Sequence, residues 1–122
     1  MQQHKSMTGW TYMNGWGAFL GNEGDYRSFE AQCFPLYSIL RAINVTTVDY
    51  FSLDIEGAEL SVLKTIPWEA VLIKTLSIEV RNKTDEKLKD YMKSVGFQFV
   101  RFLKNGFSHD HIYAHSSITL SN

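Results

Sequence analysis

Hydrophobic residues along the chain follow either the spacing of a helical face or the short continuous runs of buried strands. The first clear pattern is helical and begins after Pro35. Four apolar residues recur there at the spacing of one helical face, namely Leu36, Ile39, Leu40 and Ile43. Proline is tolerated in a first helical turn because its missing N–H would have no partner there. We therefore expect a helix over 35–43, with Asn44 close to its C-terminal cap.

A short apolar run over 48–55 contains β-branched and aromatic residues. Such a run is typical of a strand that is buried on both faces of a parallel sheet. Gly57 interrupts the run, and an apolar helical face follows until Pro67, formed by Leu60, Val62, Leu63 and Ile66. The pattern predicts a strand, a tight turn and a helix.

A second unit of the same kind follows. Residues 75–80 form another short apolar run, which predicts a buried strand with Glu79 near its end. Thr84 is a suitable N-cap for the next helix, and Asp85 and Glu86 would complement the helix dipole. The apolar face of this helix comprises Leu88, Tyr91, Met92 and Val95. Gly96 is expected to end it.

The last third of the chain predicts a hairpin. Residues 97–103 and 109–115 form its two strands, and Asn105-Gly106 supplies a pair that tolerates positive φ angles in the turn. The order of the elements predicts an α/β fold, in which a parallel sheet is finished by one reversed strand.

The domain organisation follows from these elements. Residues 1–31 lack a clean period and are expected to be irregular, with one short strand near Trp10 to Met13. Residues 32–118 form the α/β unit, and 119–122 are a tail. The glycines at 15, 17 and 21 depart from the spacing of a nucleotide-binding turn, so we expect a loop there.

Acidic residues close both predicted strands. Asp54, Glu56 and Glu79 should lie beyond the carboxyl ends of the strands, where open α/β sheets bind their ligands. Carboxylates there could accept hydrogen bonds from a ligand, act as a general base toward a hydroxyl group, or hold a hard cation. For Glu56 and Glu59, stabilisation of the helix dipole is the alternative, and we prefer it for Glu59.

Gly57 and three histidines have open roles. Gly57 could let a ligand approach the backbone, or supply a positive φ angle at the turn, or do both. His109, His111 and His115 alternate along the last strand and would share a face, as metal ligands sometimes do. Polar residues on a solvated edge strand are the preferred interpretation, and no metal is assigned.

Composition excludes several classes of protein. Twelve basic and thirteen acidic residues give a net charge of -1, which disfavours nucleic-acid binding. The single cysteine, Cys33, excludes an internal disulfide and is expected to be buried. No run of apolar residues has the length of a signal peptide core or a membrane span.

Three segments carry a family resemblance: CFPLYSIL at 33–40, VDYFSLDIEGAE at 48–59 and LKTIPW at 63–68. From about Trp10 to His115 the chain resembles the FkbM family of methyltransferase domains, and it looks closest to the arthropod branch of Star-like proteins. The acidic motif around Gly57 is the most specific part of the resemblance.

The resemblance implies a Rossmann-like S-adenosylmethionine-dependent O-methyltransferase fold, of which this chain would supply the C-terminal half. Asp54 and Glu56 would then be catalytic, and Glu79 and Gly57 would contact the substrate, a small-molecule or glycan hydroxyl acceptor. The family's glycine-rich cofactor turn is not visible here, so we expect the isolated chain to be inactive. An exposed sheet edge is expected where another strand would pair, with weak stability or self-association as its consequence.

The Star-like branch implies an alternative. There the fold would be a recognition surface of a non-enzymatic protein in vesicle-mediated transport, located at membranes of the endoplasmic reticulum, Golgi and endosomes. A glycine-rich cofactor turn upstream would favour the enzyme, and a membrane-spanning segment without such a turn would favour transport.

Overall fold

A computed structural model describes residues 3–6, 9–12, 32–55, 57–81, 83–106 and 108–121. Near the N-terminus, β1 (Gln3–Ser6) and β2 (Gly9–Tyr12) form an antiparallel hairpin. The strand expected near Trp10 is therefore confirmed as β2, whereas β1 was not predicted. Met13 and the glycines at 15, 17 and 21 lie outside the described residues.

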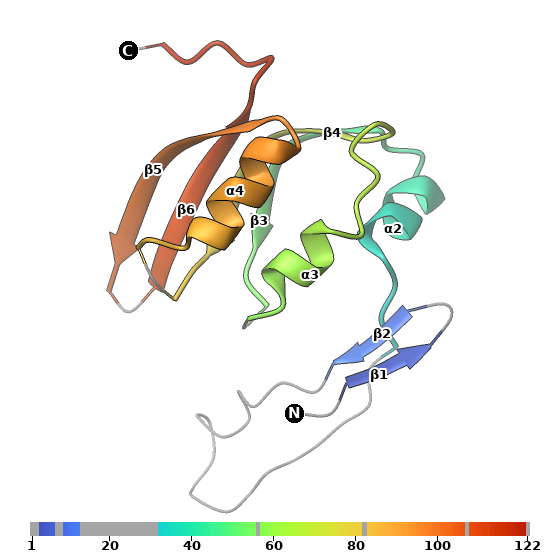
Figure 1. Cartoon of the computed structure of the whole chain (residues 1–122). Coiled ribbons are helices and arrows are strands. Elements are labelled where there is room, and N and C mark those ends of the chain that lie inside the picture. Colours follow the sequence, from blue (N-terminus) through green and yellow to red (C-terminus); the bar gives the residue numbers. More distant parts are fainter. Residues whose placement is uncertain are drawn as a thin grey trace, which may run out of the picture.

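A four-stranded mixed sheet organises the rest of the described chain (Figure 1). Its strands are β3 (Thr47–Leu53), β4 (Leu72–Glu79), β5 (Phe97–Asn105) and β6 (Ser108–His115), in the order β3-β4-β6-β5. Strands β3 and β4 are parallel, and β6 is antiparallel to both of its neighbours. The predicted single reversed strand is confirmed, but it lies inside the sheet and not at its edge.

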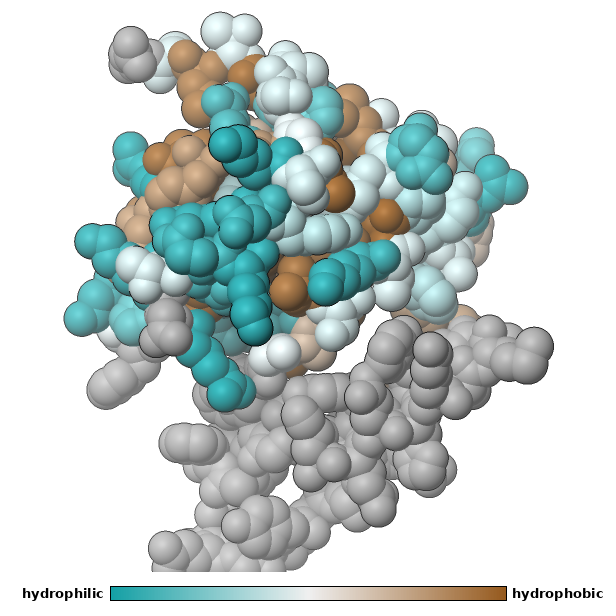
Figure 2. Space-filling model, viewed as in Figure 1, coloured by the Kyte–Doolittle hydropathy of each residue, from teal (hydrophilic) through white to brown (hydrophobic). Residues whose placement is uncertain are grey.

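Three helices accompany this sheet: α2 (Leu36–Ala42), α3 (Glu59–Leu63) and α4 (Glu86–Ser94). Helices α3 and α4 lie side by side on one face (Figure 1), where the Tyr91 hydroxyl donates to the Leu63 carbonyl over 3.0 Å. The outward side of α4 is covered by hydrophilic side chains (Figure 2). Its buried side carries Leu88 and Met92, so its predicted amphipathic pattern is confirmed.

The observed ends of the helices agree only in part with the predicted caps. Asn44 follows α2 with a φ of 57°, a left-handed conformation that asparagine tolerates after a helix. The N-cap of α4 is Asp85, whose carboxylate accepts from the Leu88 N–H over 3.1 Å. The prediction of Thr84 was wrong by one residue, because both residue types can cap and the chain path decides between them.

The terminal hairpin differs from its prediction by one residue. Asn105 pairs with Ser108 as the last residue of β5, so the turn begins at Gly106 and not at Asn105. Gly106 has the expected positive φ, 61°.

The prediction that β3 is buried on both faces was wrong. Only Leu53 is buried, while Thr47, Asp49, Tyr50 and Ser52 are exposed. The reason is the position of β3 at an edge of the sheet.

The core lies between the sheet and the helices, and every helix and strand of this unit contributes at least one buried residue to it. It comprises Leu40, Leu53, Leu63, Ile66, Val71, Ile73, Leu76, Ile78, Val80, Leu88, Met92, Phe97 and Tyr113. Trp68 packs against the Phe97 ring at 5.1 Å and donates to the Tyr91 hydroxyl over 3.0 Å. Cys33, expected to be buried, is half-buried.

Candidate functional site at the carboxyl ends of the parallel strands

Two acidic residues meet where the parallel strands end. The register pairs Leu53 with Ile78, which brings Asp54, just after β3, level with Glu79, the last residue of β4. Asp54 is exposed and Glu79 is half-buried. The carboxyl ends of adjacent parallel strands thus bring two predicted site residues together, as the sequence indicated.

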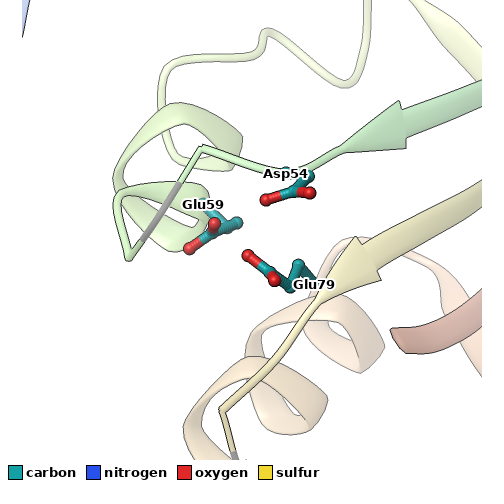
Figure 3. A group of neighbouring side chains, drawn as sticks. All are labelled: Asp54, Glu59 and Glu79. Atoms are coloured by element: carbon teal, nitrogen blue, oxygen red, sulfur yellow. The ribbon is translucent and has the colours of Figure 1, made fainter. Parts of the chain in front are cut away.

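A third carboxylate, that of Glu59, joins them from the first turn of α3. One carboxylate oxygen each of Asp54, Glu59 and Glu79 lies within 4.8 Å of the other two, and Figure 3 shows the three side chains pointing toward one another. We call this group the acidic cluster. Among the described residues, it is the one group of three or more His, Cys, Asp or Glu side chains close enough together to hold a metal ion.

Glu59 differs from the other two members because it serves the turn. Its side chain is 8% exposed, and it accepts hydrogen bonds from the Ile55 N–H at 3.0 Å and from the Gly57 N–H at 3.0 and 3.1 Å. Backbone donors thus satisfy its charge inside the protein. The preferred interpretation of Glu59 as a dipole partner therefore understated its role, which is to hold the turn that follows β3.

Gly57 has a backbone conformation that only glycine adopts readily, with a φ of 103°. One of the two roles considered for it is thereby confirmed, and its contact with a substrate stays a prediction. A Cβ atom at this position would lie 3.2 Å from Nη2 of Arg81. Arg81 therefore lies against the turn, and it is exposed.

Arg81 is a site residue that sequence reasoning missed. Its position two residues after Glu79 was the available signal, since residues that follow a strand share the sheet edge with its last acid. Glu56 lies outside the described residues, so its catalytic role stays a prediction. The acidic cluster can accept hydrogen bonds from hydroxyl or ammonium groups, or ligate a hard cation.

The three histidines lie on one face of β6, but this strand is not a solvated edge. It runs between β4 and β5, and His111 is fully buried. The interpretation of a solvated edge strand was therefore wrong, because pairing with β4 could not be read from local pattern.

Both ring nitrogens of His111 have partners within the fold. Nε2 lies 2.8 Å from the Lys83 carbonyl, which can only accept, so Nε2 carries the proton. Nδ1 then accepts from the Tyr113 hydroxyl over 3.0 Å. No nitrogen of this ring is left for a metal ion, and the histidines form no metal-binding group with the other described residues.

Burial governs the titration of this pair. It lowers the pKa of His111 below the ordinary value of 6.5, although the hydrogen bond to the Lys83 carbonyl acts in the opposite direction. Burial also raises the pKa of the Tyr113 hydroxyl, with Asp85 and Glu86 acting in the same direction. The neutral forms of both residues are thus the stable ones in the folded protein.

Among the described residues, no helix has the length and apolar character needed to cross a membrane.

Comparison with known proteins identifies the family of this chain. No curated protein matches the chain in sequence. The model of the methyltransferase FkbM domain matches residues 3–99, a range that includes the whole acidic cluster and ends within β5. Because the match covers more than half of the sequence, the chain belongs to the methyltransferase FkbM domain family.

Proposed function

We propose that the acidic cluster takes part in methyl transfer from S-adenosylmethionine to an acceptor hydroxyl. The observation that carries the proposal is the convergence of Asp54, Glu59 and Glu79 at the carboxyl ends of β3 and β4, inside the range that matches a methyltransferase family. Ligands of open α/β sheets bind at this edge.

The chemistry of the cluster suits such a cofactor. S-adenosylmethionine carries a positive sulfonium and an ammonium group, and carboxylate oxygens attract positive charge and accept hydrogen bonds from N–H and O–H donors. When bound, the cofactor would supply an activated methyl group. Asp54 is the exposed member of the cluster and can face it, whereas the Glu59 oxygens already accept from backbone amides of the turn.

Each acidic residue near the strand ends has a distinct role in this proposal. Asp54 is exposed and would act as the general base. The acceptor oxygen would gain the methyl group as the sulfur–methyl bond of the sulfonium breaks and leaves a neutral thioether, and the hydroxyl proton would pass to the Asp54 carboxylate. Glu79 orients the acceptor by hydrogen bonding. Glu59 fixes the turn at Gly57, which follows Asp54 in the chain. Glu56 would assist Asp54.

The acceptor is a small molecule or a glycan with a free hydroxyl group. Hydroxyl groups suit two neighbouring carboxylates, since one can accept the proton while the other holds an adjacent donor. This chemistry supports O-methylation.

Titration calorimetry with S-adenosylmethionine tests the proposal, using the natural protein in its longest expressed form. We expect binding that Asp54→Asn weakens about tenfold, which corresponds to about 1.4 kcal/mol. Asp90→Asn is the matched control, because Asp90 is an exposed aspartate of α4 outside the cluster. Equal binding by both variants and the natural protein would contradict the role of Asp54.

The Star-like alternative gives a different result in the same experiment. A recognition surface for transport cargo predicts no binding of S-adenosylmethionine by any form of the protein. Cofactor binding that persists in Asp90→Asn and weakens in Asp54→Asn favours the enzyme.

A further inference from the structure

His111 on β6 is a buried polar side chain that has no part in the proposed methyl transfer. None of its surface is exposed, and its ring packs edge-on against the rings of Phe99 and Phe102, with centroids 5.1 and 6.1 Å away. Burial of an imidazole costs free energy that an apolar side chain of similar size would not cost, and it lowers the pKa of His111. Two hydrogen bonds distinguish this ring from an apolar one, so they indicate its role.

The two hydrogen bonds of His111 reach different parts of the fold. Nδ1 accepts from the hydroxyl of Tyr113, which lies on the same strand, so this bond stays within the sheet. Nε2 donates to the carbonyl of Lys83 over 2.8 Å. Lys83 lies in the segment that leads from β4, the strand that ends at Glu79, to α4. One bond of the ring thus connects the sheet with the chain that follows a residue of the acidic cluster.

The segment after β4 is held against the β5–β6 hairpin at further points. The Val80 N–H donates to the His109 carbonyl over 2.8 Å, which extends the pairing of β4 with β6 by one residue. The Lys83 ammonium group lies 5.8 Å from the centroid of the Phe102 ring, within the range of a cation–π interaction. Together with the imidazole bond, these contacts anchor the chain on both sides of Arg81.

Arg81 transmits this anchoring to the turn at Gly57. A Cβ atom on Gly57 would lie 3.2 Å from Nη2 and 3.8 Å from Cζ of Arg81, so the guanidinium group itself rests beside the glycine. From α3, the Glu59 carboxylate accepts from the Gly57 N–H at 3.0 and 3.1 Å. The turn that follows Asp54 is therefore held both by α3 and by the segment after β4.

We propose that His111 is a positioning residue of the candidate site: its bond to the Lys83 carbonyl fixes the segment after β4 and thereby keeps Arg81 against the turn at Gly57. A buried hydrogen bond is electrostatically stronger than one in water, and it restricts the geometry of the groups that it joins. The effect of His111 on cofactor binding rests on the proposed function, whereas its effect on the Gly57 turn does not.

Two substitutions separate the two bonds of the ring. In His111→Gln, the amide group lies as many bonds from the backbone as Nε2 does, so it can still donate to Lys83 but leaves the Tyr113 hydroxyl without its acceptor. In His111→Asn, the amide group takes the place of Nδ1, so it can still accept from Tyr113 but leaves the Lys83 carbonyl without its donor. Each variant loses one buried bond, and a purely structural role predicts the same consequence for both.

Amide hydrogen exchange of the natural protein in its longest expressed form measures the effect on the turn. We expect His111→Asn to accelerate exchange of the Gly57 amide about tenfold, because the segment that holds Arg81 is released. His111→Gln should leave this exchange within about twofold of the natural protein. Arg81→Ala should give the same acceleration as His111→Asn, and Arg101→Ala, which removes an exposed arginine of β5, should give none.

Titration calorimetry with S-adenosylmethionine on the same proteins measures the consequence for the site. The affinity should fall about tenfold in His111→Asn and in Arg81→Ala, and it should stay within about twofold in His111→Gln. The double variant of His111→Asn and Arg81→Ala should lose no more affinity than either single variant, because both substitutions interrupt the same line of contacts.

Equal exchange of the Gly57 amide in His111→Gln and His111→Asn would overturn the proposal, and so would additive losses in the double variant. Circular dichroism verifies that each variant is folded. If His111→Asn does not fold, Arg81→Ala decides alone: faster exchange of the Gly57 amide supports the proposal, and unchanged exchange overturns it. A natural protein that binds no S-adenosylmethionine would contradict the proposed function, and the exchange measurements would still decide the role of His111.

Discussion

The acidic cluster and the His111–Tyr113 pair are both groups of polar side chains beside the sheet, yet they differ in burial and in hydrogen bonding. His111 is fully buried, and each of its nitrogens has a partner in the chain. In the acidic cluster, Asp54 is exposed and three carboxylates gather within 4.8 Å. A buried, satisfied group maintains the fold, whereas an exposed carboxylate beside two others at a strand end keeps oxygen atoms accessible to solvent.

Glu59 belongs geometrically to the cluster but resembles His111 in its bonding. It is 8% exposed, and backbone amides satisfy its oxygens. The comparison therefore separates a structural member of the cluster, Glu59, from Asp54 and Glu79, whose contact with a ligand stays a prediction.

His111→Ala is expected to have the largest effect on stability. It removes a buried ring and leaves the Lys83 carbonyl and the Tyr113 hydroxyl without their partner. We expect a loss of about 3–4 kcal/mol in the free energy of unfolding, measured by urea denaturation. His109→Ala, on the same face but half-buried, is the control and should cost clearly less. Equal losses of stability in the two variants would contradict a special structural role for His111.

Glu59→Gln tests whether this residue acts as a structural group. The amide keeps the shape of the side chain, but it loses the charge and replaces one acceptor by a donor that faces the Gly57 N–H. We expect a loss of about 2 kcal/mol in the free energy of unfolding. Glu86→Gln is the control, since Glu86 is exposed on α4. A loss no greater than that of the control would place Glu59 with Asp54 and Glu79.

The pH dependence of stability reports on His111 directly. Its pKa is lowered by burial in the folded state, so the unfolded chain binds more protons once the pH falls below about 6.5. The contribution of His111 to stability is therefore present above that pH and decreases as the pH falls toward the folded-state pKa. Urea denaturation across this range should give a steeper decline for the natural chain than for His111→Phe, and identical slopes would contradict the assignment.

Asp54→Asn should have the smallest effect on stability. The side chain is exposed and approaches two other carboxylates, so removal of its charge costs no buried interaction. We expect a change within about 0.5 kcal/mol in the free energy of unfolding. A loss as large as that of Glu59→Gln would show that Asp54 belongs with the structural groups.

The candidate site was predictable in part because its residues are close in sequence to strand ends. Asp54 and Glu79 were identified from short apolar runs that end in acids, and the parallel register brings them together. The role of Glu59 was not predictable, because its bonds to the Ile55 and Gly57 amides depend on how the turn closes. The position of Arg81 two residues after Glu79 was a signal in the sequence, but its contact with the turn at Gly57 came only from the structure.

The sequence by itself determined the local elements: the helical face of α4, a helix after Gly57 that proved shorter than expected because α3 ends at Leu63 and leaves Ile66 outside it, the strands that end in acids, and the positive φ angles of Gly57 and Gly106. Each depends on a spacing of two or nearly four residues, or on one residue's conformational range, so a short window contains the information.

Only the tertiary structure decided which strand lies where. Strand β6 pairs with β4, which precedes it by about thirty residues, and this pairing buries His111 that local pattern assigned to a solvated edge. The same arrangement leaves β3 at the edge, although its apolar run is typical of an interior strand. Strand order depends on contacts between distant segments, and the periodicity of one segment does not encode its neighbour.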